Sequence, residues 1–202
     1  MQRDTVSAIA EHGIRLRHFG SAYTLAEIQN QVSLMAWRDL YFYWRDRHVD
    51  GRPPSRAQID PPLDLPRLLP NLILYDRVDG DFRVRLAGSE IVRRGGRDAT
   101  GRKLIQDMAT YEGMITLIEF LTRIFETETP VIFSVARSDA GAFGAIGILM
   151  PLCAADGTVE MVLGGVFYRQ TRTGIPAEPW SPGALTELSL PQMLEENIEV
   201  FR

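Results

Sequence analysis

Four short motifs follow one another in residues 43–104, YWRDRHVDGRPPSRAQIDPPLDLPRLLPNLILYDRVDGDFRVRLAGSEIVRRGGRDATGRKL. In chain order they are Tyr43-Trp44; Pro54 and Arg56 with Ile59-Asp60-Pro61, leading to Leu68-Leu69-Pro70; Arg85-Leu86-Ala87-Gly88-Ser89; and Gly96-Arg97-Asp98-Ala99-Thr100-Gly101-Arg102. Two runs rich in apolar residues, 72–75 and 82–86, are separated by Asp79-Gly80. Because Asp-Gly is a strong hairpin signal, these runs are predicted to be paired strands.

Periodic apolar residues predict helices on both sides of this stretch. They recur every three or four positions from Leu25 to Trp44 and again over residues 114–125, which is typical of amphipathic helices. Asp60-Pro61 is expected to begin a shorter helix that ends near Pro70. Residues 89–108 are rich in glycine and are expected to be irregular. Three further strands are predicted, at Val131–Arg137, Ala145–Cys153 and Val159–Tyr168.

This order of motifs and elements resembles a family of short bacterial proteins that carry a divergent PAS sensory domain. The resemblance covers residues 35–169. It implies an α+β fold, a PAS-like five-stranded antiparallel sheet with helices on one face, plus the long N-terminal helix. It also implies a sensory or interaction module. One position departs mildly from the family pattern, because the usual Gly-Thr reads Gly88-Ser89 and so keeps the hydroxyl group.

The chain is expected to divide into four parts. Residues 1–23 form an N-terminal flank, 24–50 the amphipathic helix, and 51–169 the PAS-like domain. Residues 170–202 form a Pro-rich, acidic C-terminal tail in which Ser181-Pro182 is predicted to start a short helix.

Composition limits the classes of function. The net charge of −4 argues against broad nucleic-acid binding, which needs a basic surface. The single cysteine, Cys153, excludes an internal disulfide and a multi-cysteine metal site, and it fits a reducing compartment. The sequence has no apolar run long enough to span a membrane and no signal-peptide pattern. A cytoplasmic location is therefore expected.

Catalytic motifs are missing from the sequence. All three histidines, His12, His18 and His48, precede the predicted sheet, and no catalytic or metal-binding residues are predicted. Gly96 and Gly101 have the spacing of a P-loop, but no Gly-Lys-Ser/Thr ending follows. The same region gives a basic cluster, interpreted either as an anion or partner patch or as a solvated loop: Arg93, Arg94, Arg97, Arg102 and Lys103. An enzyme or a nucleic-acid binder has this cluster as its only support.

The resemblance also bears on cofactors. Flavin-binding photosensors of the PAS superfamily share an Asn-Cys-Arg-Phe-Leu-Gln motif, whereas this chain has Tyr111-Glu112-Gly113 at that place. Haem-binding members offer a histidine on or near the following helix, and residues 111–127 contain none. Haem and covalent flavin are therefore disfavoured, and no cofactor is predicted. An unknown small molecule remains an alternative. Six apolar residues are predicted to point inward, where they form either the wall of a ligand pocket or ordinary hydrophobic core: Leu86, Leu117, Leu121, Phe133, Ile148 and Val166.

Two hypotheses of function follow. The first is a stand-alone PAS-type sensory or adaptor protein, not an enzyme, that acts in signal transduction through protein–protein contacts and has no output domain of its own. A protein partner or a homodimer would use the long helix through Leu25, Ile28, Val32, Met35 and Trp44, unless that helix covers its own sheet. The second is a metabolite-binding protein with an apolar pocket between the sheet and the helix at 114–125.

Overall fold

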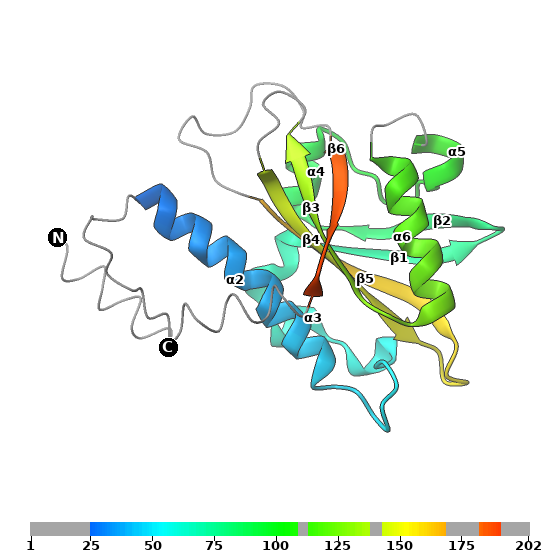
Figure 1. The fold of residues 1–202 in the computed structure, drawn as a ribbon. Coiled ribbons are helices and arrows are strands. Elements are labelled where there is room, and N and C mark those ends of the chain that lie inside the picture. The colour runs from blue at the N-terminus through cyan, green and yellow to red at the C-terminus, as the bar shows by residue number, and fades with distance from the viewer. Residues whose placement is uncertain (1–24, 109–112, 138–142, 169–181, 191–202) are drawn as a thin grey trace.

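A six-stranded antiparallel sheet in the order β2-β1-β5-β4-β3-β6 organises the chain (Figure 1). The computed structural model describes residues 25–108, 113–137, 143–168 and 182–190. The strands are β1 (Leu72–Val78), β2 (Asp81–Ala87), β3 (Val131–Arg137), β4 (Phe143–Cys153), β5 (Val159–Tyr168) and β6 (Pro182–Leu188). The helices are α2 (Leu25–Arg45), α3 (Pro61–Asp64), α4 (Ser89–Gly95), α5 (Leu104–Met108) and α6 (Met114–Thr127), with 3-10 turns at Arg56–Gln58 and Pro66–Asn71. The predicted α+β class is thus confirmed.

The sixth strand corrects the predicted five-stranded sheet and the predicted tail. β6 pairs antiparallel with β3, so residues 182–188 form a strand of the sheet rather than the short helix predicted to start at Ser181-Pro182 within the tail. Pro182 stands at the first position of an edge strand, a place where its missing N–H removes no essential ladder bond. The predicted flank 1–23 and most of the predicted tail lie outside the described residues.

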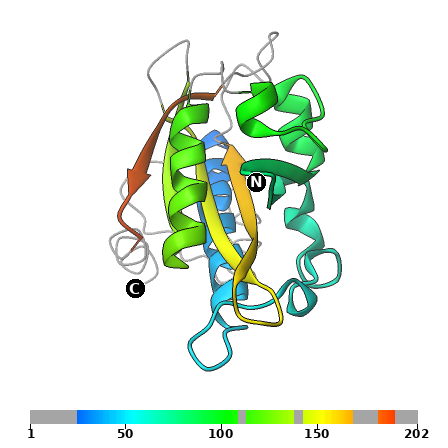
Figure 2. The same cartoon turned by 90° about the vertical axis from the view of Figure 1, so that its right-hand side faces the viewer.

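The central strands are buried on both faces. One hydrophobic cluster joins the sheet to α5 and α6, and a second joins it to α2. Along β5, Val162 lies in the first cluster and Leu163 in the second, and β4 alternates in the same way with Leu149 and Ile148. Because successive strand residues point to opposite faces, helices on both sides bury nearly every position. Figure 2 shows α6 and α2 on opposite sides of the strands.

The C-terminal half of α2 covers its own sheet. Trp37 and Leu40 are fully buried, and the Trp44 indole N–H donates a hydrogen bond of 2.7 Å to the Pro151 carbonyl oxygen. Gly165 permits the close approach, because a Cβ at that position would lie 2.6 Å from a Leu40 methyl carbon. This half of the helix therefore serves the core.

Tyr43, the first residue of the sequence motifs, fastens the chain after α2. Its hydroxyl donates a hydrogen bond to the Asp64 carboxylate and accepts one from the Asp60 N–H, both over 2.8 Å. Arg47 stacks over the Tyr43 ring and also donates to Asp64 over 2.9 Å. The short helix α3 is held against the end of α2 by these contacts.

Gly88 explains a second motif. A Cβ at this position would lie 2.4 Å from the carbonyl oxygens of Leu69 and Pro70. In any other residue the Cβ would collide with these backbone carbonyl groups, so the close crossing of the two segments requires glycine. The Gly88 N–H also donates to the Leu72 carbonyl oxygen over 2.8 Å, which ties the start of α4 to the start of β1.

Candidate functional site

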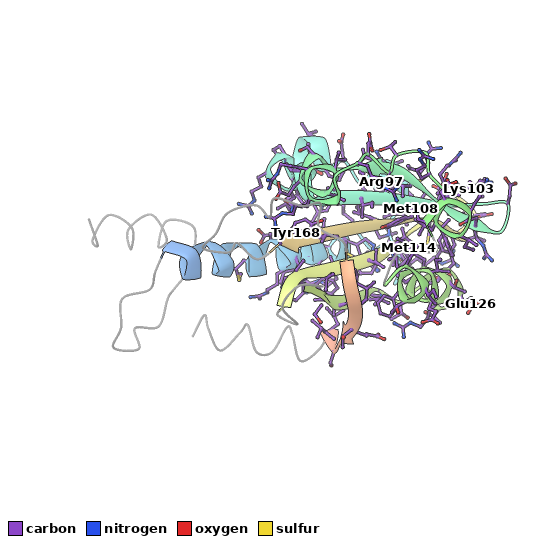
Figure 3. All side chains as sticks on the ribbon, turned by 90° about the horizontal axis from the view of Figure 1, so that it is seen from above. Arg97, Lys103, Met108, Met114, Glu126 and Tyr168 are labelled. Carbon is purple, nitrogen blue, oxygen red and sulfur yellow. The ribbon has the colours of Figure 1, made fainter. Side chains whose placement is uncertain are left out.

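A cavity of about 250 Å³ lies between the sheet and helices α4, α5 and α6. Its floor draws on all six strands: Ile73, Tyr75, Val84, Phe133, Val135, Leu149, Val166, Tyr168 and Leu185. Its roof comes from the helices and their connections: Ile91, Gly95, Arg97, Ala99, Leu104, Met108, Gly113, Met114 and Leu117. In Figure 3 the labelled side chains around this space are Arg97, Met108, Met114 and Tyr168.

Gly147 shapes the cavity floor. It lies opposite Phe133 in the β3–β4 pair, and a Cβ there would lie 2.1 Å from the Phe133 ring. The missing side chain lets the ring lie across β4, where it also packs against Phe120 of α6 with ring centroids 5.6 Å apart. A glycine in a buried strand thus makes room for an aromatic wall.

Asp81 holds α5 over the cavity. Its buried carboxylate accepts hydrogen bonds from the N–H groups of Ile105 over 2.9 Å, Gln106 over 3.0 Å and Phe82 over 2.6 Å. Burial raises the pKa of Asp81, but these hydrogen bonds outweigh it and leave the pKa below its ordinary value. The carboxylate is therefore charged at neutral pH and fixes the first turn of α5, the helix that contributes two lining side chains.

Two tyrosine hydroxyl groups interrupt the apolar floor. Burial raises the pKa of Tyr75 on β1 and of Tyr168 on β5, so both phenols are neutral at pH 7 and can donate or accept a hydrogen bond. Arg94 lies over the Tyr168 ring, 4.4 Å from its centroid, and donates to Glu90 over 2.6 Å. This stack fixes Tyr168 at the α4 end of the cavity.

Arg97 places a positive charge at the rim. Among the described residues that line the cavity it is the only charged one, and it is exposed to solvent. The next residue, Asp98, turns its carboxylate toward Thr100, whose N–H it accepts over 2.8 Å. The cavity therefore combines an apolar interior with a cation at its edge.

The predicted pocket residues have different fates. Leu117, Phe133 and Val166 line the cavity, whereas Leu121 is fully buried in the adjoining core and does not line it. Ile148 lies in the cluster under α2, on the opposite face of the sheet, so its assignment to the pocket was wrong.

Leu86 was also wrongly assigned to the interior. Its side chain is 47% exposed. The pairing of β1 with β2 shifts register after Leu74, which pairs with Leu86 while Tyr75 pairs with Val84. Arg85 is the extra residue of this bulge, and it moves Leu86 off the cavity face.

The lining residues that sequence analysis did not predict lie mainly on β1, α4 and α5. Ile73, Ile91, Leu104 and Met108 line the cavity without any local signal that separates them from ordinary core. Tyr75 and Tyr168 carried the one usable signal, a hydroxyl group next to an apolar run in each strand.

The predicted basic patch is divided among separate interactions. Its members are Arg93, Arg94, Arg97, Arg102 and Lys103. Glu90 accepts hydrogen bonds from Arg93 over 2.8 Å and from Arg94 over 2.6 Å, and Asp79 pairs with Lys103 over 3.0 Å. Arg97 is the member that lines the cavity, and Arg102, further along the same loop, is exposed and does not line it.

The predicted partner contacts on α2 are in part corrected. Trp44 is 3% exposed and committed to the sheet, so it is not available to a partner. Met35 is half-buried. The side chains of Leu25, Ile28 and Val32 lie outside the described part of the structure.

The glycine-rich segment with P-loop spacing has a structural role. Val84 exchanges backbone hydrogen bonds with it, accepting from the Gly101 N–H over 2.7 Å and donating to the Arg102 carbonyl oxygen over 3.0 Å. The segment thus covers part of the outer edge of β2, which would otherwise be an unpaired strand edge.

Cys153 lies away from the cavity, in the last position of β4. Burial raises the pKa of its thiol, which favours the protonated, unreactive form. Within the described ranges, no three His, Cys, Asp or Glu side chains are placed to hold a metal ion together. None of the helices described there is both long enough and apolar enough to cross a bilayer.

Comparison with solved structures finds several related folds at low sequence identity. The structure of VqmA bound to DPO is 14% identical with a TM-score of 0.41, and the match covers 56% of this chain and 58% of that one. The PAS domain of Bordetella pertussis BvgS is 19% identical with a TM-score of 0.37, over 69% and 98%. The LOV domain of the blue-light photoreceptor Aureochrome1 is 13% identical with a TM-score of 0.37, over 70% and 97%.

Comparison with curated proteins gives no match. A family model described as PAS domain matches residues 32–167, from within α2 to the penultimate residue of β5. The match includes all the elements that surround the cavity except β6. Because it spans more than half of the 202 residues, the chain belongs to the PAS-domain family.

Proposed function

We propose that this protein is a sensor in signal transduction that binds a small molecule in the cavity between the sheet and α4–α6. The observation that carries the proposal is the cavity itself. Its volume of about 250 Å³ lies just below the range of about 300–1,000 Å³ that is typical of sites for drug-sized molecules, so it suits a smaller ligand, and its lining is apolar with a few polar groups, as in such sites.

The signal is passed on through contact with a protein, either a second copy or a different partner. β4 and β5 contribute Leu149 and Val166 to the cavity, while their opposite faces carry Ile148 and Leu163 in the cluster under α2. A ligand that shifts these strands therefore changes how α2 packs on the sheet. The N-terminal turns of α2 extend beyond the strands of the sheet (Figure 1), and the proposed partner contacts the helix there.

The site is proposed to bind and not to catalyse. Tyr75 and Tyr168 remain protonated at pH 7, because burial raises the pKa of each, and a neutral phenol is a poor general base. Asp81, the buried carboxylate nearest to the roof, is already occupied by three backbone N–H groups.

A matched pair of substitutions on α6 tests ligand binding. Leu117→Trp fills the cavity, whereas Ile115→Trp adds the same ring two residues away on the helix, at a position that is 65% exposed. The full chain is screened by thermal shift and calorimetry against small aromatic and branched apolar molecules. We expect hits that bind wild type and Ile115→Trp equally and do not bind Leu117→Trp.

Saturating ligand sets the scale of the shift. A ligand at a hundredfold excess over Kd stabilises the folded state by about 2.7 kcal/mol. Both variants are first checked for folding by circular dichroism. The proposal is wrong if no compound stabilises the wild type, or if folded Leu117→Trp binds every hit as well as Ile115→Trp does.

A further inference from the structure

The geometry points to a ligand class: we infer that the cavity takes a small aromatic or branched-chain monocarboxylate, with its apolar body inside and its carboxylate at Arg97. This inference rests on the proposed function, because it specifies what the same cavity binds. It is argued from the size of the cavity, the charge of its lining and the position of that charge.

The volume limits the size of the ligand. A closed apolar cavity of about 150 Å³ accommodates benzene. In proportion, the cavity of about 250 Å³ suits a molecule of about ten non-hydrogen atoms. One ring with a short side chain fills that space. Phe133 provides a flat surface for the ring, Met114 a polarisable one and Leu117 an aliphatic one.

The charge of the lining sets the sign of the ligand. Among the described lining residues, Arg97 is positive and none is acidic. An anion therefore meets an attractive field at the rim, whereas an ammonium group meets none from these residues.

The position of Arg97 keeps the cost of desolvation low. A carboxylate taken into the apolar interior would lose its hydration without compensation, which is strongly unfavourable. At the exposed rim it retains water on one side and receives the planar guanidinium on the other. Tyr75 and Tyr168 add neutral hydroxyl groups to the lining, which can hydrogen-bond to polar atoms of a ligand.

A pair of probes and a pair of variants isolate the charge interaction. The probes are phenylpropanoate and phenylpropanamide, which have the same shape and differ in charge. The variants are Arg97→Gln, at the rim, and Arg102→Gln, which removes the same charge from an exposed residue outside the lining. Affinities are measured by calorimetry on the full chain at pH 7, and Arg97→Lys tests whether charge alone restores binding.

We expect wild type and Arg102→Gln to bind the carboxylate about ten-fold more tightly than the amide, as a single charge-assisted hydrogen bond implies. Arg97→Gln should remove this preference and leave amide binding unchanged, and Arg97→Lys should restore part of it. Equal binding of the two probes by wild type, or a preference that survives in Arg97→Gln, overturns the inference.

The remaining outcomes separate this inference from the proposed function. If neither probe binds but uncharged apolar molecules do, the cavity is a ligand site and the carboxylate class is wrong. If no small molecule binds in the broader screen either, the proposed function fails together with the inference.

Discussion

Asp81→Asn should loosen the roof of the cavity. In the wild type, one carboxylate oxygen accepts the N–H groups of Phe82 and Ile105, and the other accepts the N–H of Gln106. An asparagine can keep its oxygen toward the first pair. Its NH₂ group then faces the Gln106 N–H, so that one hydrogen bond is replaced by a contact between two donors.

The magnitude follows from the change in acceptor charge. Hydrogen bonds to charged groups contribute about 1.5–3 kcal/mol each, and neutral ones about 0.5–1.5 kcal/mol. Two bonds are weakened and one is lost, but the first turn of α5 is exposed enough for water to replace part of the loss. We therefore expect a decrease of about 2 kcal/mol in the free energy of unfolding, or about 4–8 °C in Tm for a chain of this size.

The assay is urea denaturation of wild type, Asp81→Asn and Asp79→Asn. Asp79→Asn is the matched control, because it removes one negative charge from the same hairpin. Asp79 forms an ion pair with Lys103 at an exposed position. Exposed pairs contribute about 0–1 kcal/mol. Asparagine also tolerates the positive φ of 53° that Asp79 adopts.

The pH dependence gives a second test. The folded-state pKa of Asp81 is lowered, so its contribution is present above the unfolded value of about 3.9 and is lost as pH falls through the folded pKa. The deficit of Asp81→Asn should be constant from pH 7 to 5 and shrink below pH 4. A decrease in the free energy of unfolding below about 0.5 kcal/mol at pH 7 is typical of an ordinary surface substitution, and it would refute the role of Asp81 in fixing α5.

Two further predictions concern the floor of the cavity and α2. Gly147→Val should destabilise the fold by about 1–3 kcal/mol in the same urea assay, because its Cβ would overlap the Phe133 ring, and Phe133→Leu in the same chain should recover part of the loss. Ile28→Glu with Val32→Glu should weaken self-association or partner binding, measured by analytical ultracentrifugation and by capture of the partner. Unchanged association of the folded variant would show that this part of α2 is not the contact.

Local signals predicted most of the fold. Asp79-Gly80 separates two strands that do pair, and the apolar period of residues 114–125 gives α6 within two residues of its observed end at Thr127. β6 was missed because its signal is weak: it begins with Pro182, and its leucines at 185 and 188 are only half-buried. An edge strand gains its structure mainly from pairing with β3, which is 45 or more residues away in sequence.

The site was harder to predict for two physical reasons. A strand buried on both faces has no polar alternation, so the sequence around Ile148 and Leu149 does not say which of them faces the cavity. The bulge at Arg85 reverses the face of the residues after it, so the alternation of Phe82 and Val84 does not extend to Leu86. Both errors arise from partners distant in sequence.

The motifs that identify the fold and the residues that line the cavity are largely different sets. Tyr43 and Trp44 fasten α2, and Gly88 allows two backbone segments to cross. These roles are the same whatever the cavity holds. Arg97 and Ala99 are the exceptions, since they belong to the last motif and also line the cavity. Family membership therefore fixes the frame of this PAS-domain protein, whereas the proposed ligand must be identified from the cavity residues, and Arg97 is the first of these to test.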